Sequence, residues 1–155
     1  TGTSRRGGPV SSPAMEWLQS LQAARSAAPA AAPADLYSAD HVAADHEFDD
    51  LLDEASGHVA IGELEEAVAL YRRCTVLDPQ SFDAWHSLGM ALMKTDQVKE
   101  AIGAGLMATT LKPNDLLAWT GLSQMYVKAG QIAEAEDAKG KARILSLGGK
   151  VVKDA

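Results

Sequence analysis

The sequence repeats itself with a period of 34 residues, and this feature limits most strongly what the chain can fold into. The interval separates Pro79 from Pro113 and Trp85 from Trp119. The same step relates further columns: Leu88 and Leu122; Gly62, Asp96 and Gly130; Ala67, Ala101 and Ala135. A fixed period of this length is typical of arrays in which each unit buries its apolar side against the next unit. The chain is therefore expected to form a row of small units instead of one closed core.

The residue types in these columns predict two helices per unit. The alanine column lets two helices approach closely. Pro79 and Pro113 end a helix, because the residue before a proline avoids helical geometry. The column of glycine and aspartate marks the turn between the two helices. The predicted fold class is all-α, an α-solenoid of antiparallel helix pairs, with repeats at about 48–79, 82–113 and 116–147 inside a domain that spans 35–147.

The columns resemble the tetratricopeptide repeat (TPR), whose units form a right-handed superhelix. That family carries a Trp, a Leu-Gly pair, a bulky residue, a turn Gly, a small Ala, an aromatic residue, a second Ala and a Pro. The middle unit here reads Trp85, Leu88, Gly89, Leu92, Asp96, Ala101, Gly105, Ala108 and Pro113. The third reads Trp119, Leu122, Ser123, Tyr126, Gly130, Ala135, Lys139, Ala142 and Leu147. The first reads Leu51, Glu54, Ala55, His58, Gly62, Ala67, Tyr71, Cys74 and Pro79.

Three departures from the family pattern carry expectations of their own. Gly105 stands where the family has an aromatic residue, so a gap in the packing is expected there. Gly103 and Gly105 each weaken their helix by about 1 kcal/mol relative to Ala. Glu136 and Lys139 replace apolar residues in the third unit, as expected for a terminal unit that faces water. The stretch 35–46 is expected to extend the first helix backwards.

The resemblance implies a concave groove, lined by the first helix of each unit, that holds a peptide or helix of another protein. The groove-facing positions are Asp49, Leu52, Ser56, Val59, Asp83, His86, Met90, Met93, Leu117, Thr120, Gln124 and Val127. Met side chains suit a groove that adapts to an apolar ligand, although Met90 and Met93 could instead pack in the core. Members that bind heat-shock-protein tails use a basic clamp, and no basic residue stands at the equivalent positions Leu52, Ser56, Ser87, Leu117 and Gly121.

The chain outside the repeats divides into short zones. Residues 1–14 are expected to be a disordered tail and residues 148–155 a C-terminal tail. Residues 15–25 predict a short amphipathic helix, because Trp17, Leu18 and Leu21 share one face. This candidate docking helix could fold back onto its own repeats or dock on a partner. Residues 26–34, rich in Ala and Pro, form a linker.

Composition excludes several classes of protein. The net charge of −7 argues against a nucleic-acid partner, since phosphate binding needs clustered Lys and Arg. No apolar run approaches the length of about 20 residues that spans a bilayer. A single cysteine, Cys74, rules out an intrachain disulfide and fits a reducing compartment, so a cytoplasmic location is predicted.

Charge is distributed unevenly along the chain. The segment 35–66 holds acidic residues and no Lys or Arg, whereas 139–153 holds basic residues and no acidic ones. One interpretation is two solvated ends. The other is salt-sensitive self-association, in which the acidic front of one copy meets the basic end of another.

No motif indicates catalysis, a cofactor or a metal. His41 and His46 stand five residues apart, whereas helical metal sites place His four apart. Cys74 lies in a small-residue column and is expected to be a buried thiol. The predicted function is a non-catalytic adaptor or assembly subunit that binds a protein, and the alternative is a small acidic chaperone for an apolar secreted protein.

Overall fold

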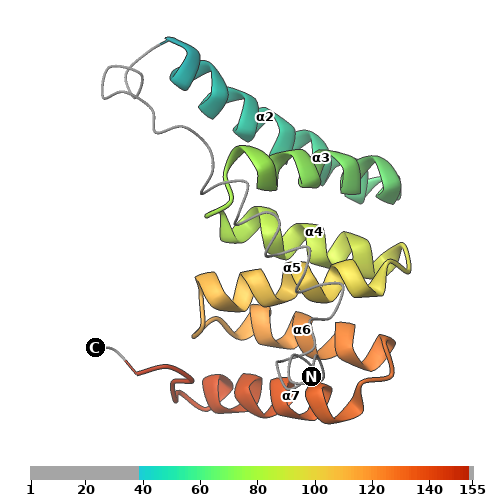
Figure 1. Cartoon of the computed structure of the whole chain (residues 1–155), viewed down its shortest axis with the longest axis vertical. Helices are drawn as coiled ribbons and strands as arrows, with labels where there is room; N and C mark the ends of the chain where they lie inside the picture. Colours follow the sequence, from blue (N-terminus) through green and yellow to red (C-terminus); the bar gives the residue numbers. More distant parts are fainter. Residues whose placement is uncertain (1–38, 154–155) are drawn as a thin grey trace, which may run out of the picture.

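The computed structural model describes residues 39–153, with side chains from residue 46 onward. Helices in this range are α2 (Ala39–Ala60), α3 (Leu64–Leu77), α4 (Phe82–Lys94), α5 (Val98–Leu111), α6 (Leu116–Lys128) and α7 (Ile132–Ser146). They form three antiparallel pairs, α2–α3, α4–α5 and α6–α7, stacked in one row (Figure 1). Within 39–153 no strand occurs, and no helix is long and apolar enough to cross a bilayer. The zones predicted for 1–14, 15–25 and 26–34 lie outside the described residues.

The ends of the helices follow the 34-residue period. Ser81 Oγ accepts a hydrogen bond from Ala84 N at 3.2 Å, and Asp115 Oδ1 accepts one from Ala118 N at 3.0 Å, so α4 and α6 are capped alike. The turn inside each pair contains a residue with positive φ: 84° at Gly62, 65° at Asp96 and 79° at Gly130. Aspartate tolerates this conformation better than most residues, which explains why it can replace glycine there.

The two repeat tryptophans each form a hydrogen bond to the loop that connects consecutive units. Trp85 Nε1 donates to Pro79 O at 2.7 Å, and Trp119 Nε1 donates to Pro113 O at 2.8 Å. Each ring thus fills apolar space and also donates a hydrogen bond to a carbonyl of the loop that follows the preceding helix. The spacing of Pro and Trp within each unit is therefore a structural requirement.

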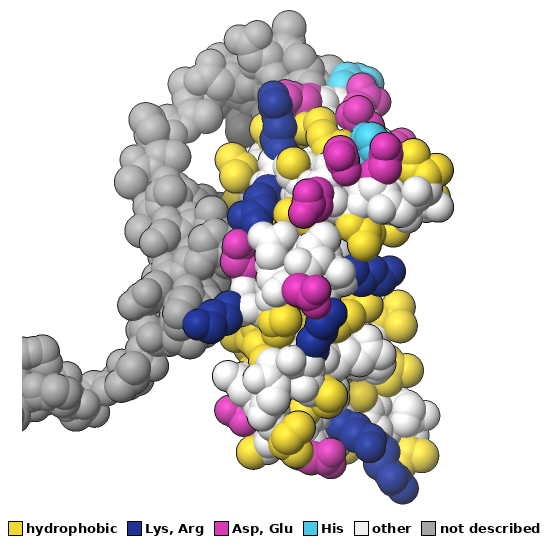
Figure 2. Space-filling view, turned by 90° about the vertical axis from the view of Figure 1, so that its right-hand side faces the viewer, with side chains coloured by type: hydrophobic (Ala, Val, Ile, Leu, Met, Phe, Trp, Pro, Cys, Tyr) yellow, Lys and Arg dark blue, Asp and Glu magenta, His cyan; other side chains and the backbone are white. Residues whose placement is uncertain are grey.

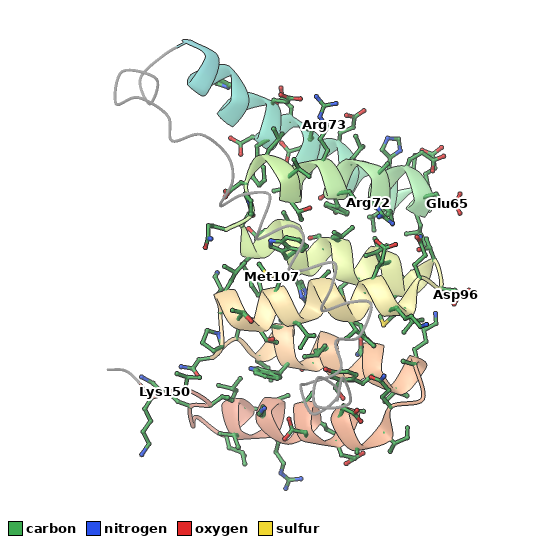
Figure 3. All side chains as sticks on the ribbon, in the orientation of Figure 1. Glu65, Arg72, Arg73, Asp96, Met107 and Lys150 are labelled. Atoms are coloured by element: carbon green, nitrogen blue, oxygen red, sulfur yellow. The ribbon has the colours of Figure 1, made fainter. Side chains whose placement is uncertain are left out.

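Small and branched apolar residues build the core between the helices. The alanine column is buried, with exposures of 0% at Ala67, 0% at Ala101 and 2% at Ala135. Leu88 and Leu122, which occupy another repeat column, are 0% and 1% exposed. Two ion pairs connect units across their boundary: Arg72 Nη1 lies 2.7 Å from Glu100 Oε2, and Lys128 Nζ lies 2.8 Å from Asp96 Oδ1. Figure 3 labels Arg72 on α3 and Asp96 in the turn between α4 and α5.

The gap expected at Gly105 is absent, and this expectation was wrong. Gly105 is buried, and a Cβ atom built on it would lie 2.8 Å from Met125 Sδ and 3.0 Å from Leu122 Cδ1. A Cβ atom on Gly89 would likewise lie 2.8 Å from Met125 Cε. The flexible Met125 side chain, which is 1% exposed, therefore fills the space where the family places an aromatic ring.

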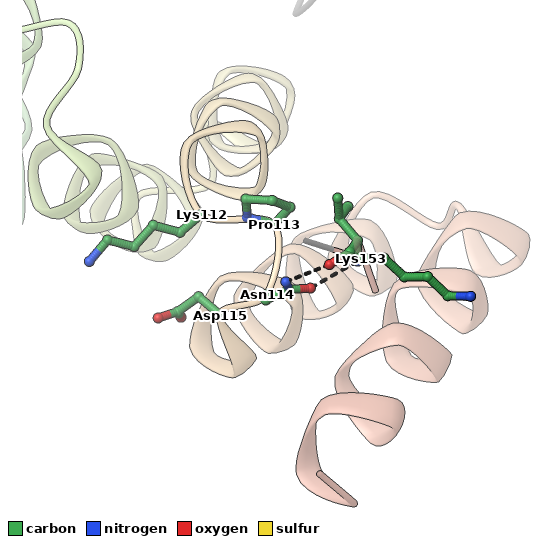
Figure 4. A pocket seen from close by; sticks show the side chains of 6 residues that line it. Lys112, Pro113, Asn114, Asp115 and Lys153 are labelled. Carbon is green, nitrogen blue, oxygen red and sulfur yellow. Dashed lines mark hydrogen bonds between the residues drawn. The ribbon is translucent and has the colours of Figure 1, made fainter. Parts of the chain in front are cut away.

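The segment after α7 turns back toward the connection between α5 and α6. Asn114 Oδ1 accepts hydrogen bonds from Val151 N and Val152 N, both at 2.9 Å, and Asn114 Nδ2 donates to Val152 O at 2.8 Å (Figure 4). One side chain therefore holds the described part of the predicted C-terminal tail.

Candidate protein-binding groove

The residues predicted to face the groove lie on α2, α4 and α6, the first helix of each pair, and α4 contacts α6 directly. The exposed members of the set are Asp49, Ser56, Asp83, Leu117, Gln124 and Val127. The half-buried members are Leu52, Val59, His86, Met90, Met93 and Thr120. This division is what a shallow surface requires, since some side chains form its floor and others border it.

Two half-buried residues of α4 close the contact with α6. A Cβ atom on Gly121 would lie 3.2 Å from Met90 Sδ and 3.3 Å from His86 Cε1, so both side chains rest on the bare backbone of α6. The His86 ring also stacks on Phe82, with centroids 5.4 Å apart and planes 7° apart. Glycine at position 121 is thus required for the close approach of the two groove helices.

A small cavity of about 140 Å³ opens between α2, α3 and α4. It is lined by Val59, Leu64, Tyr71, His86, Ser87, Met90, Ala91 and Lys94. An apolar cavity of about 150 Å³ holds a group the size of benzene, so this one suits a single apolar side chain. Three of the predicted groove residues, Val59, His86 and Met90, meet at this cavity.

Sequence reasoning missed the contribution of α3 to this cavity. Tyr71 is 4% exposed, and its hydroxyl lies 3.1 Å from Ser56 Oγ, which donates to Leu52 O at 3.0 Å. The aromatic column of the first unit was recognisable, but the partner of its hydroxyl group was not. The bond fixes the Tyr71 ring as a wall of the cavity and places a polar group at its α2 side.

The groove carries little positive charge. Burial lowers the pKa of His86, and the nearby carboxylates of Asp115 and Asp83 oppose this shift. The His86 ring is therefore neutral at neutral pH. Lys94 is exposed at the edge of the cavity, while Asp49 and Asp83 add negative charge to the groove positions.

Apolar residues extend the groove along α6. Leu117 is 65% exposed and Val127 is 57% exposed, although both are large apolar side chains. Met90 and Met93 are half-buried and pack against the core, and their role in ligand binding stays a prediction. The candidate docking residues Trp17, Leu18 and Leu21 lie outside the described residues.

The reactive residue types do not assemble into a site in the described part of the chain. No group of three His, Cys, Asp or Glu side chains there could hold a metal ion. Cys74 is 0% exposed, its Sγ lies 4.0 Å from Phe48 O, and burial raises the pKa of its thiol. A buried thiol with a raised pKa is a poor nucleophile. The side chain of His46 is exposed, and that of His41 is outside the described residues.

Comparison with known proteins identifies the repeat. Residues 58–96 match the sequence model of the TPR repeat. No curated protein sequence matches the chain. Together with the solved structures described next, the match confirms the resemblance to the tetratricopeptide repeat and the all-α solenoid of helix pairs.

Several solved structures share the fold. The translocator chaperone SycD of type III secretion in Yersinia enterocolitica has a TM-score of 0.62 and 19% identity, covering 66% of this chain and 78% of SycD. MamA AMB-1 has a TM-score of 0.63 and 24% identity over 66% of this chain, which spans 60% of the MamA chain. The second TPR of Spaghetti (RPAP3), bound to the HSP90 peptide SRMEEVD, has a TM-score of 0.62 and 20% identity, covering 66% and 97%. At these identities the likeness concerns the fold alone.

Proposed function

Because residues 58–96 match the TPR repeat and the helix pairs stack as they do in TPR proteins, we propose that this chain is a non-catalytic adaptor or assembly subunit that binds another protein. The groove of α2, α4 and α6 holds the ligand, a peptide or a helix. The observation that carries the proposal is the small cavity beside Met90, together with the exposed apolar side chains of Leu117 and Val127 on the next groove helix, α6. A cytoplasmic location is part of this proposal.

The chemistry of the groove restricts the ligand. One apolar side chain of the partner enters the cavity, and further apolar side chains one or two turns away lie on Leu117 and Val127. Asp49 and Asp83 disfavour an acidic peptide. The RPAP3 domain is bound to the HSP90 peptide SRMEEVD, but a ligand of that charge is a poor match for this groove, which lacks the basic clamp.

A chaperone for an apolar secreted protein is the second candidate. SycD is a translocator chaperone, and its fold, although only 19% identical, matches 66% of this chain. Half-buried Met side chains at positions 90 and 93 would adapt to different apolar segments. If this candidate is right, co-expression keeps an otherwise insoluble secreted protein in solution, whereas an adaptor leaves the solubility of its partner unchanged.

Substitution of an exposed groove residue tests the proposal. Val127→Asp places a charge in the groove, and Val76→Asp places the same charge on α3, where Val76 is 65% exposed. Proteins retained from the native host by the unchanged chain are identified by mass spectrometry, and the strongest candidate is purified and titrated by calorimetry. We expect Val127→Asp to weaken binding by about tenfold or more, since a charge then faces an apolar group.

The matched control decides between outcomes. Val76→Asp is expected to bind the partner with unchanged affinity, because Val76 lies outside the groove helices. If both substitutions weaken binding equally, or if neither weakens it, the partner does not use the groove. Circular dichroism of both variants verifies that they remain folded.

A further inference from the structure

The outer faces of α2 and α7 carry charged residues at positions that are buried inside the solenoid. The contact between α5 and α6 defines these positions, since a Cβ atom on Gly105 would meet Leu122 and Met125. Thr109, one turn further along α5, is 6% exposed and shares this face. These residues form the face through which one unit of the chain packs against the next.

In α7 the equivalent positions, one period later, are basic. Lys139 corresponds to Gly105, and Arg143 corresponds to Thr109. Both side chains are exposed, and among the described residues neither has an ion-pair partner. Glu136, in the position of Ile102, is the acidic member of the same stripe. A further unit of the same chain therefore could not pack here with apolar side chains.

In α2 the equivalent positions, two periods before α6, hold acidic residues or a glycine, which has no side chain. The correspondences are Glu54 for Leu122, Asp50 for Ala118 and Gly57 for Met125. In α6 these three positions are each 1% exposed, whereas in α2 all three are exposed. A Cβ atom on Gly57 would meet no other atom within 4 Å. The face of α2 is thus complementary in charge to the basic pair on α7.

We propose that copies of this chain associate end to end, with α2 of one copy packed on α7 of the next in the register that joins α6 to α5. In that register Lys139 meets Glu54 of the second copy, because Gly105 meets Leu122. The antiparallel course of the two helices then brings Arg143 to Asp50 of the second copy. Gly57 of the second copy leaves open the space that Met125 fills inside the chain, and the longer Lys139 side chain occupies it.

The neighbouring pair of groove helices supplies a third contact in the same register. Gly121 of α6 lies against His86 and Met90 of α4. One period later, Thr120 and Gln124 take the positions of these two residues, and Asp53 of the second copy takes the position of Gly121. The amide group of Gln124 therefore faces a carboxylate, which accepts a hydrogen bond from it, while Thr120 Oγ1 keeps its own bond to Leu116 O at 2.9 Å.

The described segments leave both faces accessible. The described residues after α7, up to residue 153, turn back to Asn114 beside α6, so this segment does not cover the outer side of α7 (Figure 4). Acidic side chains crowd the end of the molecule that α2 forms, whereas the end that α7 forms carries projecting basic side chains together with acidic ones (Figure 2). The two charged ends lie at opposite ends of the row of helices (Figure 1).

This contact joins two different surfaces, which determines how the assembly grows. Each added copy leaves one α2 face and one α7 face open, so the contact does not stop at a dimer. The mean size is expected to rise continuously with protein concentration. It should fall with added salt, because ions in solution screen the attraction between solvent-exposed charges on the two faces.

Sedimentation velocity of the full chain at low and high salt tests the proposal, with charge reversal on each face. Lys139→Glu and Glu54→Lys each replace an attractive pair with two like charges, and each should weaken association by about tenfold or more. The double variant, Lys139→Glu with Glu54→Lys, restores the pair in reversed order and should recover most of the association. Lys99→Glu, an exposed reversal on α5 away from both faces, should have no effect.

Mixing the two single variants gives an independent result. The intact Lys139 of one variant faces the intact Glu54 of the other, and their two altered faces are complementary as well. The mixture is therefore expected to associate more strongly than either variant alone. Carbodiimide coupling should yield an intermolecular Lys139–Glu54 peptide from the unchanged chain.

Four results would overturn the proposal. These are a monomer at every concentration and salt level, a plateau at the dimer, a double variant no better than the single ones, and equal weakening by Lys99→Glu. Association that disappears on deletion of residues 1–38, while charge reversal leaves it intact, would instead assign the contact to that segment. A monomer would show that the charged faces serve only to solvate the two ends.

Discussion

Replacement of Gly105 by alanine should show how much the helix propensity of a residue and its packing each contribute to the free energy of unfolding. Gly105 and Gly140 both lie inside the second helix of a unit, and alanine is favoured over glycine in a helix interior by about 1 kcal/mol. A Cβ atom on Gly140 meets no atom within 4 Å, whereas on Gly105 it meets Met125 Sδ at 2.8 Å and Leu122 Cδ1 at 3.0 Å. The two substitutions are thus alike in backbone effect and differ in their surroundings.

The structure gives the expected size and sign of each effect. Gly140→Ala should raise the free energy of unfolding by about 1 kcal/mol. Gly105→Ala gains the same amount and loses about 1 to 3 kcal/mol by overpacking, so the net result runs from about zero to a loss of about 2 kcal/mol. In a Met125→Ala background the closest clash is removed, and Gly105→Ala should become favourable by about 1 kcal/mol.

Urea unfolding followed by far-ultraviolet circular dichroism and by tryptophan fluorescence measures these differences. Equal dependence on urea in all variants shows that they are compared between the same states. The reasoning is refuted if Gly105→Ala stabilises the chain as much as Gly140→Ala does, because Met125 then does not fill the space above Gly105. It is also refuted if the effect of Gly105→Ala is the same with and without Met125.

Three further predictions concern single side chains. Asn114→Ala should accelerate hydrogen exchange at the Val151 and Val152 amides about tenfold or more, while Asn114→Asp, which keeps the accepting oxygen, should protect both amides. Since burial lowers the pKa of His86, the unfolded chain takes up the proton first, and unfolding free energy should fall as pH drops through about 6.5, the ordinary value. His86→Gln should remove this slope, measured by urea unfolding across that pH range. The Cys74 thiol should react with a maleimide slowly in the folded chain and rapidly in urea, because burial blocks access and raises its pKa.

Much of the fold could be predicted because the repeat consists of helix ends and turns, which depend on residues close together in the sequence. The step from Pro79 to Pro113 and from Trp85 to Trp119 reports helix ends and turns, which depend on residues a few positions apart. The identical bonds from both tryptophans to the preceding prolines, at 2.7 and 2.8 Å, show why the columns keep their spacing. Groove positions followed from the same counting, and Val59, His86 and Met90 do meet at one cavity.

Contacts between units could be known only from the packed helices, because they depend on the rotamers that the side chains adopt there. The sequence was enough to predict the solenoid, its helix pairs and the charged ends, since these follow from period and composition. It did not reveal that Met125 fills the space above Gly105, that Tyr71 binds Ser56, or that Asn114 holds the C-terminal segment. Such contacts join residues 15 to 37 positions apart, and only the packed helices bring those atoms together.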